Sequence, residues 1–234
     1  MKTLKSYDKY FESNTVIELD FSYKKLIKLP ELPNTLEKLH CSYNNLTELP
    51  KLPKSLKYLN CNLNKIYILP KLPKTLEYLN CGNNNLNKLP NLSNVLEALL
   101  CHNNYLKKLP KLPNNLKYLD CKNNDLERLS ILLPNQLEEL YCQNNFLKKL
   151  PELPENLNNL ICYDNNLTEL PNLPDTLERL FCYNNDLSEL PKLPESLKYL
   201  ECSNNNLPYD DLDSYWEWYY EQHPDEKAAK DFNI

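Results

Sequence analysis

Hydrophobic residues recur along this chain with a period of 20 residues. The clearest copy runs from Leu36 to Pro53 and reads Leu-x-x-Leu-x-Cys-x-x-Asn-x-Leu-x-x-Leu-Pro-x-Leu-Pro. The next copies begin at Leu56 and Leu76, and an imperfect first copy places Phe21 where the later copies have cysteine. A fixed period of this length is typical of stacked coils that form one elongated body.

Each repeat changes its periodicity near the centre. The Leu-x-x-Leu-x-Cys half alternates apolar and polar positions, which favours a short strand. The Leu-Pro-x-Leu-Pro half excludes a helix, because proline lacks the N–H donor and forces the preceding residue into extended forms. That half is therefore expected to be extended or polyproline II backbone. The sequence predicts a thin, strongly curved parallel β-solenoid, with about ten short strands on its concave face and no helix on its convex side.

The repeats define a solenoid over residues 15–207, with a cap at either end. Residues 1–14 precede the first repeat and have apolar residues at helical spacing, which predicts a helix that covers the open end of the stack. The one irregular interval runs from Cys121 to Cys142, where Ser-Ile-Leu-Leu-Pro at 130–134 replaces Pro-x-Leu-Pro. We expect a small bulge on the convex side there.

The C-terminal segment, residues 208–234, predicts a small aromatic helical cap. Asp210 or Asp211 is a suitable N-cap, and four residues share one helical face: Leu212, Tyr215, Trp216 and Tyr219. We expect this face to shield the core of the last repeat. An aromatic docking peptide or a membrane-interface helix is the alternative, although the acidic residues around the aromatic ones disfavour anionic membranes.

The repeat pattern resembles the leucine-rich repeat. The Leu-Pro-x-Leu-Pro ending is similar to the short subtype found in bacterial type III effectors, and the asparagine content resembles that of repeat proteins from giant DNA viruses. The resemblance covers roughly residues 16–207 and implies a leucine-rich repeat horseshoe that binds proteins. This chain has cysteine where the effector subtype usually has an aliphatic residue. Some effectors also carry a ubiquitin-ligase domain after the repeats, and this chain extends only about 30 residues beyond them.

An asparagine follows each repeat cysteine by three residues, at the point where the chain turns inward. A carboxamide both donates and accepts hydrogen bonds, so each asparagine can bind backbone groups of its own coil and of the adjacent coil. We therefore predict a structural asparagine ladder. Its members are Asn44, Asn64, Asn84, Asn104, Asn124, Asn145, Asn165, Asn185 and Asn205.

The nine cysteines occupy one inward-facing position of the repeat. Stacked strands lie about 4.8 Å apart, whereas a disulfide needs its two Cβ atoms about 3.8 Å apart. A straight column also cannot surround a tetrahedral zinc ion with four sulfurs. We therefore interpret the cysteines as small buried hydrophobic residues, with a metal site or disulfides as the alternative. Free thiols in this number favour a reducing compartment.

The candidate binding residues lie on the outward strand positions, because the concave face is the usual binding surface of such solenoids. Polar residues dominate its first half, and the second half becomes aromatic and apolar. A patch of this composition is typical of a protein-binding hot spot. The patch consists of Tyr141, Ile161, Tyr163, Phe181 and Tyr183, with Arg179 beside it, and the predicted binding residues also include Leu100 and His102. A second tyrosine column, interrupted at several positions, contains Tyr58, Tyr78, Tyr118 and Tyr199.

Enzymatic chemistry finds little support in the sequence. There are three histidines without a nucleophile motif, and a single glycine does not allow a glycine-rich phosphate loop. We expect no catalytic residues, no metal and no cofactor. The 27 Lys and Arg residues are scattered and the net charge is −5, so no nucleic-acid surface is indicated. No apolar run approaches the ~20 residues of a membrane span.

The prediction for function is a non-enzymatic protein–protein interaction module that binds a partner on the concave face. The resemblance leaves two alternatives open, namely a subunit that recruits substrates for a separate ubiquitin ligase, and a structural or virion component. The N-terminus lacks the apolar core of a secretory signal, so a cytoplasmic location is expected, in a host cytosol or a virion if the resemblance holds. The identity of the partner and the oligomeric state stay open.

Overall fold

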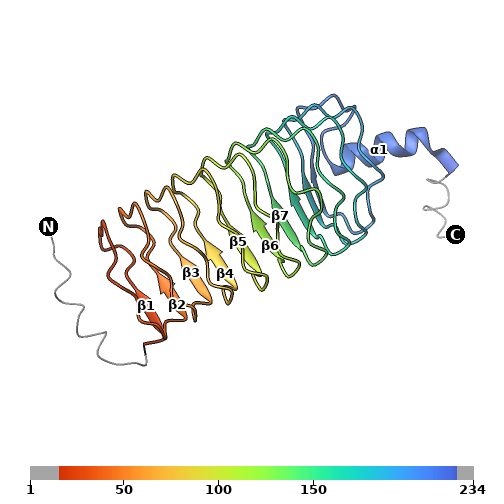
Figure 1. The fold of residues 1–234 in the computed structure, drawn as a ribbon. Helices are drawn as coiled ribbons and strands as arrows, with labels where there is room; N and C mark the ends of the chain where they lie inside the picture. Colours follow the sequence, from red (N-terminus) through yellow and green to blue (C-terminus); the bar gives the residue numbers. More distant parts are fainter. Residues whose placement is uncertain (1–15, 226–234) are drawn as a thin grey trace.

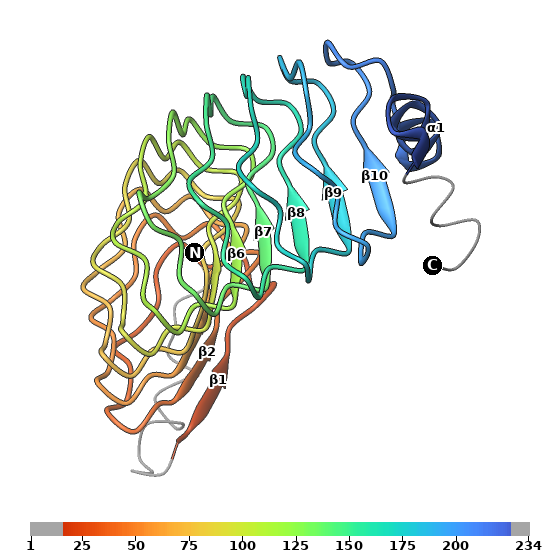
Figure 2. The same cartoon turned by 90° about the vertical axis from the view of Figure 1, so that its right-hand side faces the viewer.

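Ten parallel strands form one sheet in the computed structural model, which describes residues 16–225. Figure 1 shows the coils stacked along one axis, and Figure 2 shows that the stack curves, as in a leucine-rich repeat horseshoe. The strands are β1 (Glu18–Asp20), β2 (Lys38–His40), β3 (Tyr58–Asn60), β4 (Tyr78–Asn80), β5 (Ala98–Leu100), β6 (Tyr118–Asp120), β7 (Glu139–Tyr141), β8 (Asn159–Ile161), β9 (Arg179–Phe181) and β10 (Tyr199–Glu201). The predicted solenoid is confirmed.

Within the ten-stranded sheet, each strand pairs with its neighbours in the sequence, and equivalent residues of successive repeats face each other. Leu39, for example, pairs with Leu59, and Leu59 with Leu79. The central leucine of each strand points into the core, and these three leucines are fully buried. The ladder continues past the strands, because the N–H of Cys61 donates to the carbonyl of Asn80 at 2.8 Å.

The convex half of each coil contains only turns and bends within residues 16–207, so the coils lack a convex helix there. The interval from Cys121 to Cys142 is one residue longer than the others. The extra length lies at Ile131 and Leu132, which are 90% and 74% exposed. Leu133 returns to the core, and Tyr141 pairs in register with Asp120. The extra residue therefore forms the expected bulge without disturbing the strands.

The asparagine ladder forms as the sequence predicts. The amide nitrogen of Asn84 donates to the carbonyls of Cys61, Cys81 and Gly82 at 3.0–3.1 Å, and its Oδ1 accepts from the N–H of Ile66 at 3.0 Å. Two of these four partners lie in the preceding coil. Since the pattern recurs in the other repeats, each ladder asparagine joins its own coil to the one before it.

The residue before each ladder asparagine has a left-handed backbone, which L-residues other than asparagine and aspartate adopt at a cost. Seven of the nine repeats with a ladder asparagine place Asn or Asp there, and Tyr43 and Leu63 occupy the other two positions. Several of these side chains form a second chain of hydrogen bonds. Asn103 donates to Asn83 at 2.9 Å, and Asn123 donates to Asn103 at 2.7 Å.

The C-terminal end of the solenoid is closed by an antiparallel segment and by the helix α1 (Leu212–Gln222). Glu201 of β10 pairs with Asp211, which caps the helix by accepting from the N–H of Ser214 at 2.8 Å. Tyr215 of the predicted helical face is 2% exposed. Tyr209 was not predicted to be buried, yet it is 5% exposed and packs edge-on against Tyr215. The predicted N-terminal cap, residues 1–14, lies outside the described residues.

The repeat cysteines are free thiols in the core, and all nine are buried. Desolvation raises the pKa of the Cys61 and Cys142 thiols to about 12. The same cause raises the pKa of Cys101 and Cys121 well above its usual range. Buried thiols of this kind are held in the neutral form, as expected for small apolar core residues.

We expect Asn124→Ala to lower the free energy of unfolding by about 1–3 kcal/mol, because it leaves buried backbone groups without partners. The amide nitrogen of Asn124 donates to the carbonyls of Cys101, Cys121 and Lys122, and its Oδ1 accepts from the N–H of Leu106. Urea denaturation followed by circular dichroism measures the change. The exposed Asn114 provides the control, and an equal loss in Asn114→Ala would contradict the ladder's role.

The buried thiols also predict a steep loss of stability at alkaline pH. Their pKa is higher in the folded state than in the unfolded state, so their contribution is complete below about pH 9 and is lost as the pH rises toward about 12. Each thiol costs about 1.4 kcal/mol per pH unit in that window. Urea denaturation in reductant at pH 9 and pH 10 tests this. The variant Cys61→Ala/Cys142→Ala should show a shallower slope, and an unchanged slope would assign the effect to other groups.

Candidate partner-binding surface

Three columns of outward side chains cover the concave face, because successive residues of a strand point to opposite sides of the sheet. The columns consist of the residue before the central leucine, the residue after it, and the residue after the cysteine. We call five residues from strands β7 to β9 and the turns that follow them the aromatic patch. They are Tyr141, Ile161, Tyr163, Phe181 and Tyr183.

The register of the sheet brings the aromatic patch together. Tyr141 pairs with Ile161, and Ile161 pairs with Phe181, so the three side chains lie on adjacent strands. The rings of Tyr163 and Tyr183 stack beside them, with centroids 4.3 Å apart and an interplanar angle of 9°. Ile161 is only 6% exposed, whereas the side chains of Tyr141 and Phe181 on either side are half-buried. The patch is therefore a packed apolar surface.

Hydrogen bonds fix Tyr141 at one edge of the patch. Its hydroxyl donates to Glu139 Oε2 at 2.6 Å and accepts from Asn159 Nδ2 at 3.1 Å. Burial and the bond to Glu139 raise the pKa of Tyr141 well above its usual range. Burial and the neighbouring Tyr163 raise the pKa of Tyr183 to about 12. These phenols are therefore neutral at physiological pH and present fixed, uncharged rings.

Two buried acceptor atoms border the aromatic patch without a hydrogen-bond partner among residues 16–225. They are Oε1 of Gln143, in the turn after β7, and Oδ1 of Asn159, on β8. The two residues are 5% and 8% exposed. A buried acceptor without a donor is costly, but each of these atoms has an exposed area below 1 Å², so a molecule that binds on the surface does not reach them without a local rearrangement. Sequence reasoning missed both, because amides at outward positions give no signal of burial.

His102 takes part in a different cluster, toward the middle of the solenoid. Its Nδ1 lies 3.0 Å from Asp120 Oδ2, without the geometry of a hydrogen bond, and Lys122 Nζ lies 3.2 Å from the same oxygen. Its Nε2 lies 3.1 Å from Asn83 Nδ2. Asp120 is 2% exposed, so the carboxylate is buried beneath the histidine and beside the lysine that balances its charge.

Gly82 makes room for this histidine. A Cβ atom added to Gly82 would lie 2.5 Å from both Cε1 and Nε2 of the His102 ring. The single glycine of the chain therefore serves close packing of an imidazole and not a backbone turn. Both residues directly follow a repeat cysteine, but the sequence did not predict their contact, because the direction of the histidine ring depends on Asp120 in the next coil.

Three of the predicted binding residues are not members of the aromatic patch. Leu100 is on β5 and pairs with Asp120, so strand β6 separates it from Tyr141. His102 follows the same strand β5 and contacts the buried Asp120. Arg179 is on β9 beside the patch, but its guanidinium lies 5.3 Å from the ring centroid of Tyr199.

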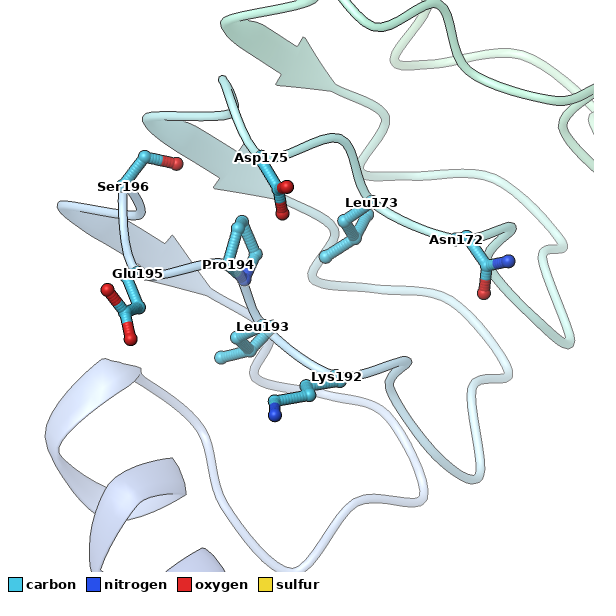
Figure 3. A pocket seen from close by; sticks show the side chains of 8 residues that line it. All are labelled: Asn172, Leu173, Asp175, Lys192, Leu193, Pro194, Glu195 and Ser196. Carbon is cyan, nitrogen blue, oxygen red and sulfur yellow. The ribbon is translucent and has the colours of Figure 1, made fainter.

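Grooves also occur between the coils, outside the concave columns. One has a volume of about 600 Å³ and lies between the last two Pro-x-Leu-Pro segments (Figure 3). Its lining residues are Asn172, Leu173, Asp175, Lys192, Leu193, Pro194, Glu195 and Ser196. A groove of about 620 Å³ occupies the equivalent position between two earlier coils, lined by residues 91, 92, 94 and 111–115. Because the shape recurs with the repeat, we do not treat it as the candidate site.

Residues 16–225 contain no group of three or more His, Cys, Asp or Glu side chains placed to hold a metal ion. Within the same residues, no helix has the length and apolar character needed to cross a membrane.

A curved parallel solenoid with 20-residue coils, a buried asparagine ladder and no convex helices in residues 16–207 defines the class of leucine-rich repeat proteins. No protein-family model matches the chain, and no curated protein sequence matches it. Solved structures do match. The leucine-rich repeat domain of a Shigella effector is 30% identical with a TM-score of 0.57, over 77% of this chain and 74% of that domain. The chain belongs to the leucine-rich repeat family.

Two further solved structures are similar to this chain. YopM from Yersinia enterocolitica is 42% identical with a TM-score of 0.78, over 81% of this chain and 42% of YopM. The functional domain of InlJ from Listeria monocytogenes, described as including a cysteine ladder, is 30% identical with a TM-score of 0.61, over 75% of this chain and 41% of that chain. This chain thus matches less than half the length of either protein. All three structures are bacterial, and the resemblance to giant-virus proteins stays a prediction.

We expect Gly82→Ala to lower the free energy of unfolding by about 1–3 kcal/mol, because the new methyl group displaces His102 and leaves the buried Asp120 carboxylate with one fewer partner. In a His102→Ala background the same change should be neutral within about 0.5 kcal/mol. Urea denaturation of the four proteins in this cycle measures the coupling. Equal costs in both backgrounds would show that the glycine serves the backbone instead.

Proposed function

We propose that this protein is a non-enzymatic binding module that holds a protein partner on its concave face, with the aromatic patch as the centre of the contact. The observation that carries the proposal is the register of β7, β8 and β9, which places Tyr141, Ile161 and Phe181 side by side next to the Tyr163–Tyr183 stack. Large rings that are rigid before binding lose little conformational entropy on association.

The polar surroundings of the patch support a protein partner. Glu139 and Asn159 hold the Tyr141 hydroxyl at the edge of the patch, so polar side chains border the apolar rings. Hot spots of protein interfaces are enriched in tyrosine and arginine. Arg179, stacked on Tyr199 beside the patch, supplies a cation at its rim.

The relatives support the proposal that the partner is a host-cell protein. The matched structures include effector proteins, among them one described as a leucine-rich effector protein from Yersinia pestis, 42% identical over 80% of this chain and 60% of that one. We propose by analogy that the partner is a protein of a host cell. This step rests on the relatives and not on the geometry of the patch.

The test is loss of the partner in the variant Phe181→Ala/Tyr183→Ala. Truncating two central rings should weaken binding at least tenfold, since hot-spot residues each contribute about 2 kcal/mol or more. Tagged full-length protein would be used to capture partners from host-cell lysate, followed by affinity measurement with the purified partner. Thermal unfolding should change little, because neither side chain belongs to the hydrophobic core.

The matched control is Tyr23→Ala/Tyr43→Ala. These two rings form an exposed stack of the same spacing, 4.3 Å, in the turns after β1 and β2, far along the solenoid from the patch. Binding that survives the patch variant, or that is lost equally in the control, would contradict the proposed centre. Co-purification of an active ubiquitin ligase, or concentration-dependent self-assembly measured by light scattering, would instead favour the ligase-recruiting or structural alternatives.

A further inference from the structure

The tyrosine column before the central leucines has a gap one residue wide. Tyr58, Tyr78, Ala98 and Tyr118 occupy successive strands, and each pairs in register with the next. The rings of Tyr58 and Tyr78 stack with centroids 4.3 Å apart and planes within 4°. Ala98 interrupts this stack, so the next ring in the column, that of Tyr118, lies two strand positions from Tyr78.

The width of this gap suits one planar group. Two strand spacings amount to about 9–10 Å. The centroids of the Tyr58 and Tyr78 rings are 4.3 Å apart. A planar group stacked at this distance from a ring on either side needs a gap slightly narrower than two strand spacings. No ring contact joins Tyr78 to Tyr118 in the part of the chain that the structure describes. Instead Tyr118 inclines toward Tyr141, at 5.4 Å and 36°. The ring of Tyr118 therefore does not fill the gap beside Tyr78.

The floor of the gap is apolar and accessible. Ala98 and Leu100 are the two outward residues of β5, and both are half-buried. We call the space bounded by Tyr78, Ala98, Leu100 and Tyr118 the tyrosine slot. An arginine side chain has the shape that this slot accommodates. Its aliphatic part can lie over Leu100 while its planar guanidinium enters between the rings of Tyr78 and Tyr118.

Charge selects a cation as the occupant. Glu77 and Glu97 directly precede β4 and β5, and both are exposed. Glu97 pairs with Lys117 at 3.1 Å. Glu77 has no cation within ion-pair distance among residues 16–225, and the cation that its charge influences is Lys57, which is itself paired with Glu37. A guanidinium between two tyrosine rings gains cation–π attraction from both faces, and a nearby carboxylate adds to it.

The same column already contains such a pair. Arg179 and Tyr199 are register partners on β9 and β10, and the guanidinium lies 5.3 Å from the ring centroid. One strand spacing in this column therefore accommodates an arginine stacked on a tyrosine. The tyrosine slot offers that arrangement twice, with the position of the arginine left vacant by Ala98.

We propose that the tyrosine slot binds an arginine side chain of a partner protein, with the guanidinium between Tyr78 and Tyr118 and Glu77 at its edge. The slot lies on β4 to β6 and meets the aromatic patch of β7 to β9 where Tyr118 contacts Tyr141, while the patch rings that the binding test removes, Phe181 and Tyr183, lie on β9 and in the turn after it. The two sites can therefore be tested separately, and either can fail without the other.

The test uses full-length protein with ¹³C-labelled tyrosine rings and the probe N-acetyl-arginine-N-methylamide. The ring signals of Tyr78 and Tyr118, assigned through Tyr78→Phe and Tyr118→Phe, should shift saturably in the millimolar range, while those of Tyr163 and Tyr183 stay in place. The matching lysine amide, which has the charge without the planar group, should bind at least fivefold more weakly. Glu77→Gln should weaken arginine binding at least twofold.

Filling the slot provides the decisive variant. Ala98→Leu should abolish the shifts of Tyr78 at an unchanged melting temperature, and Ala98→Ser should bind as the parent protein does. Equal binding of the arginine and lysine amides, or arginine binding retained in Ala98→Leu, would overturn the proposal. Tighter binding of N-acetyl-tyrosine-N-methylamide would also overturn it, because the slot would then accept aromatic rings in preference to a guanidinium.

Discussion

The hydrogen bonds of the ladder asparagines are the constraint on which the rest of this structure depends. Each coil must turn inward after its strand, and that turn places backbone carbonyls and an N–H group in the core, where they require partners. One carboxamide satisfies four such groups at once, as Asn104 does with the carbonyls of Cys81, Cys101 and His102 and the N–H of Leu86. A hydroxyl or a carboxylate has too few donors for this arrangement. Because half of these partners belong to the preceding coil, the ladder ties each coil to its neighbour at a fixed spacing.

This fixed spacing reappears on the surface. Three tyrosine pairs on different columns or turns, Tyr23–Tyr43, Tyr58–Tyr78 and Tyr163–Tyr183, all stack with ring centroids 4.3 Å apart. Their positions at equivalent points of adjacent coils explain why three separate pairs share one distance. The same regularity means that a column interrupted by a small residue leaves a gap of defined width. The surface chemistry of the solenoid is thus set by the order of side chains along each column, on a frame that the buried asparagines hold constant.

The sequence was sufficient to predict the fold, because leucine, cysteine, asparagine and proline each recur where the repeat needs them. It also placed Tyr141, Ile161 and Phe181 side by side, since strand pairing in register follows directly from a constant period. What the sequence could not predict are contacts that depend on the direction of a side chain between coils. The packing of His102 on Gly82, the burial of Asp120 and the contact of Tyr209 with the C-terminal helix are of this kind. The left-handed residue in each turn could have been predicted from the sequence, because in the repeated Asn-Asn pair the first residue adopts the left-handed conformation and the second belongs to the ladder.

Substitutions that depart from the repeat have different consequences, depending on whether the side chain makes a hydrogen bond between coils. Thr75 donates its hydroxyl to the carbonyl of Lys54 in the preceding coil, and Ser55 does the same for Asn34. Val95 has no hydroxyl for the equivalent carbonyl of Lys74, yet Ser93, which stands where other repeats have proline, donates to it at 2.7 Å. The loss of a bond between coils is therefore compensated within the same repeat. Ala98, by contrast, replaces a ring in a column whose side chains make no hydrogen bonds to the backbone of residues 16–225, and Ala98 itself is half-buried. A solenoid of this type can vary its concave columns freely because its stability resides in the bonds between coils, and this separation allows a single frame to carry distinct binding surfaces.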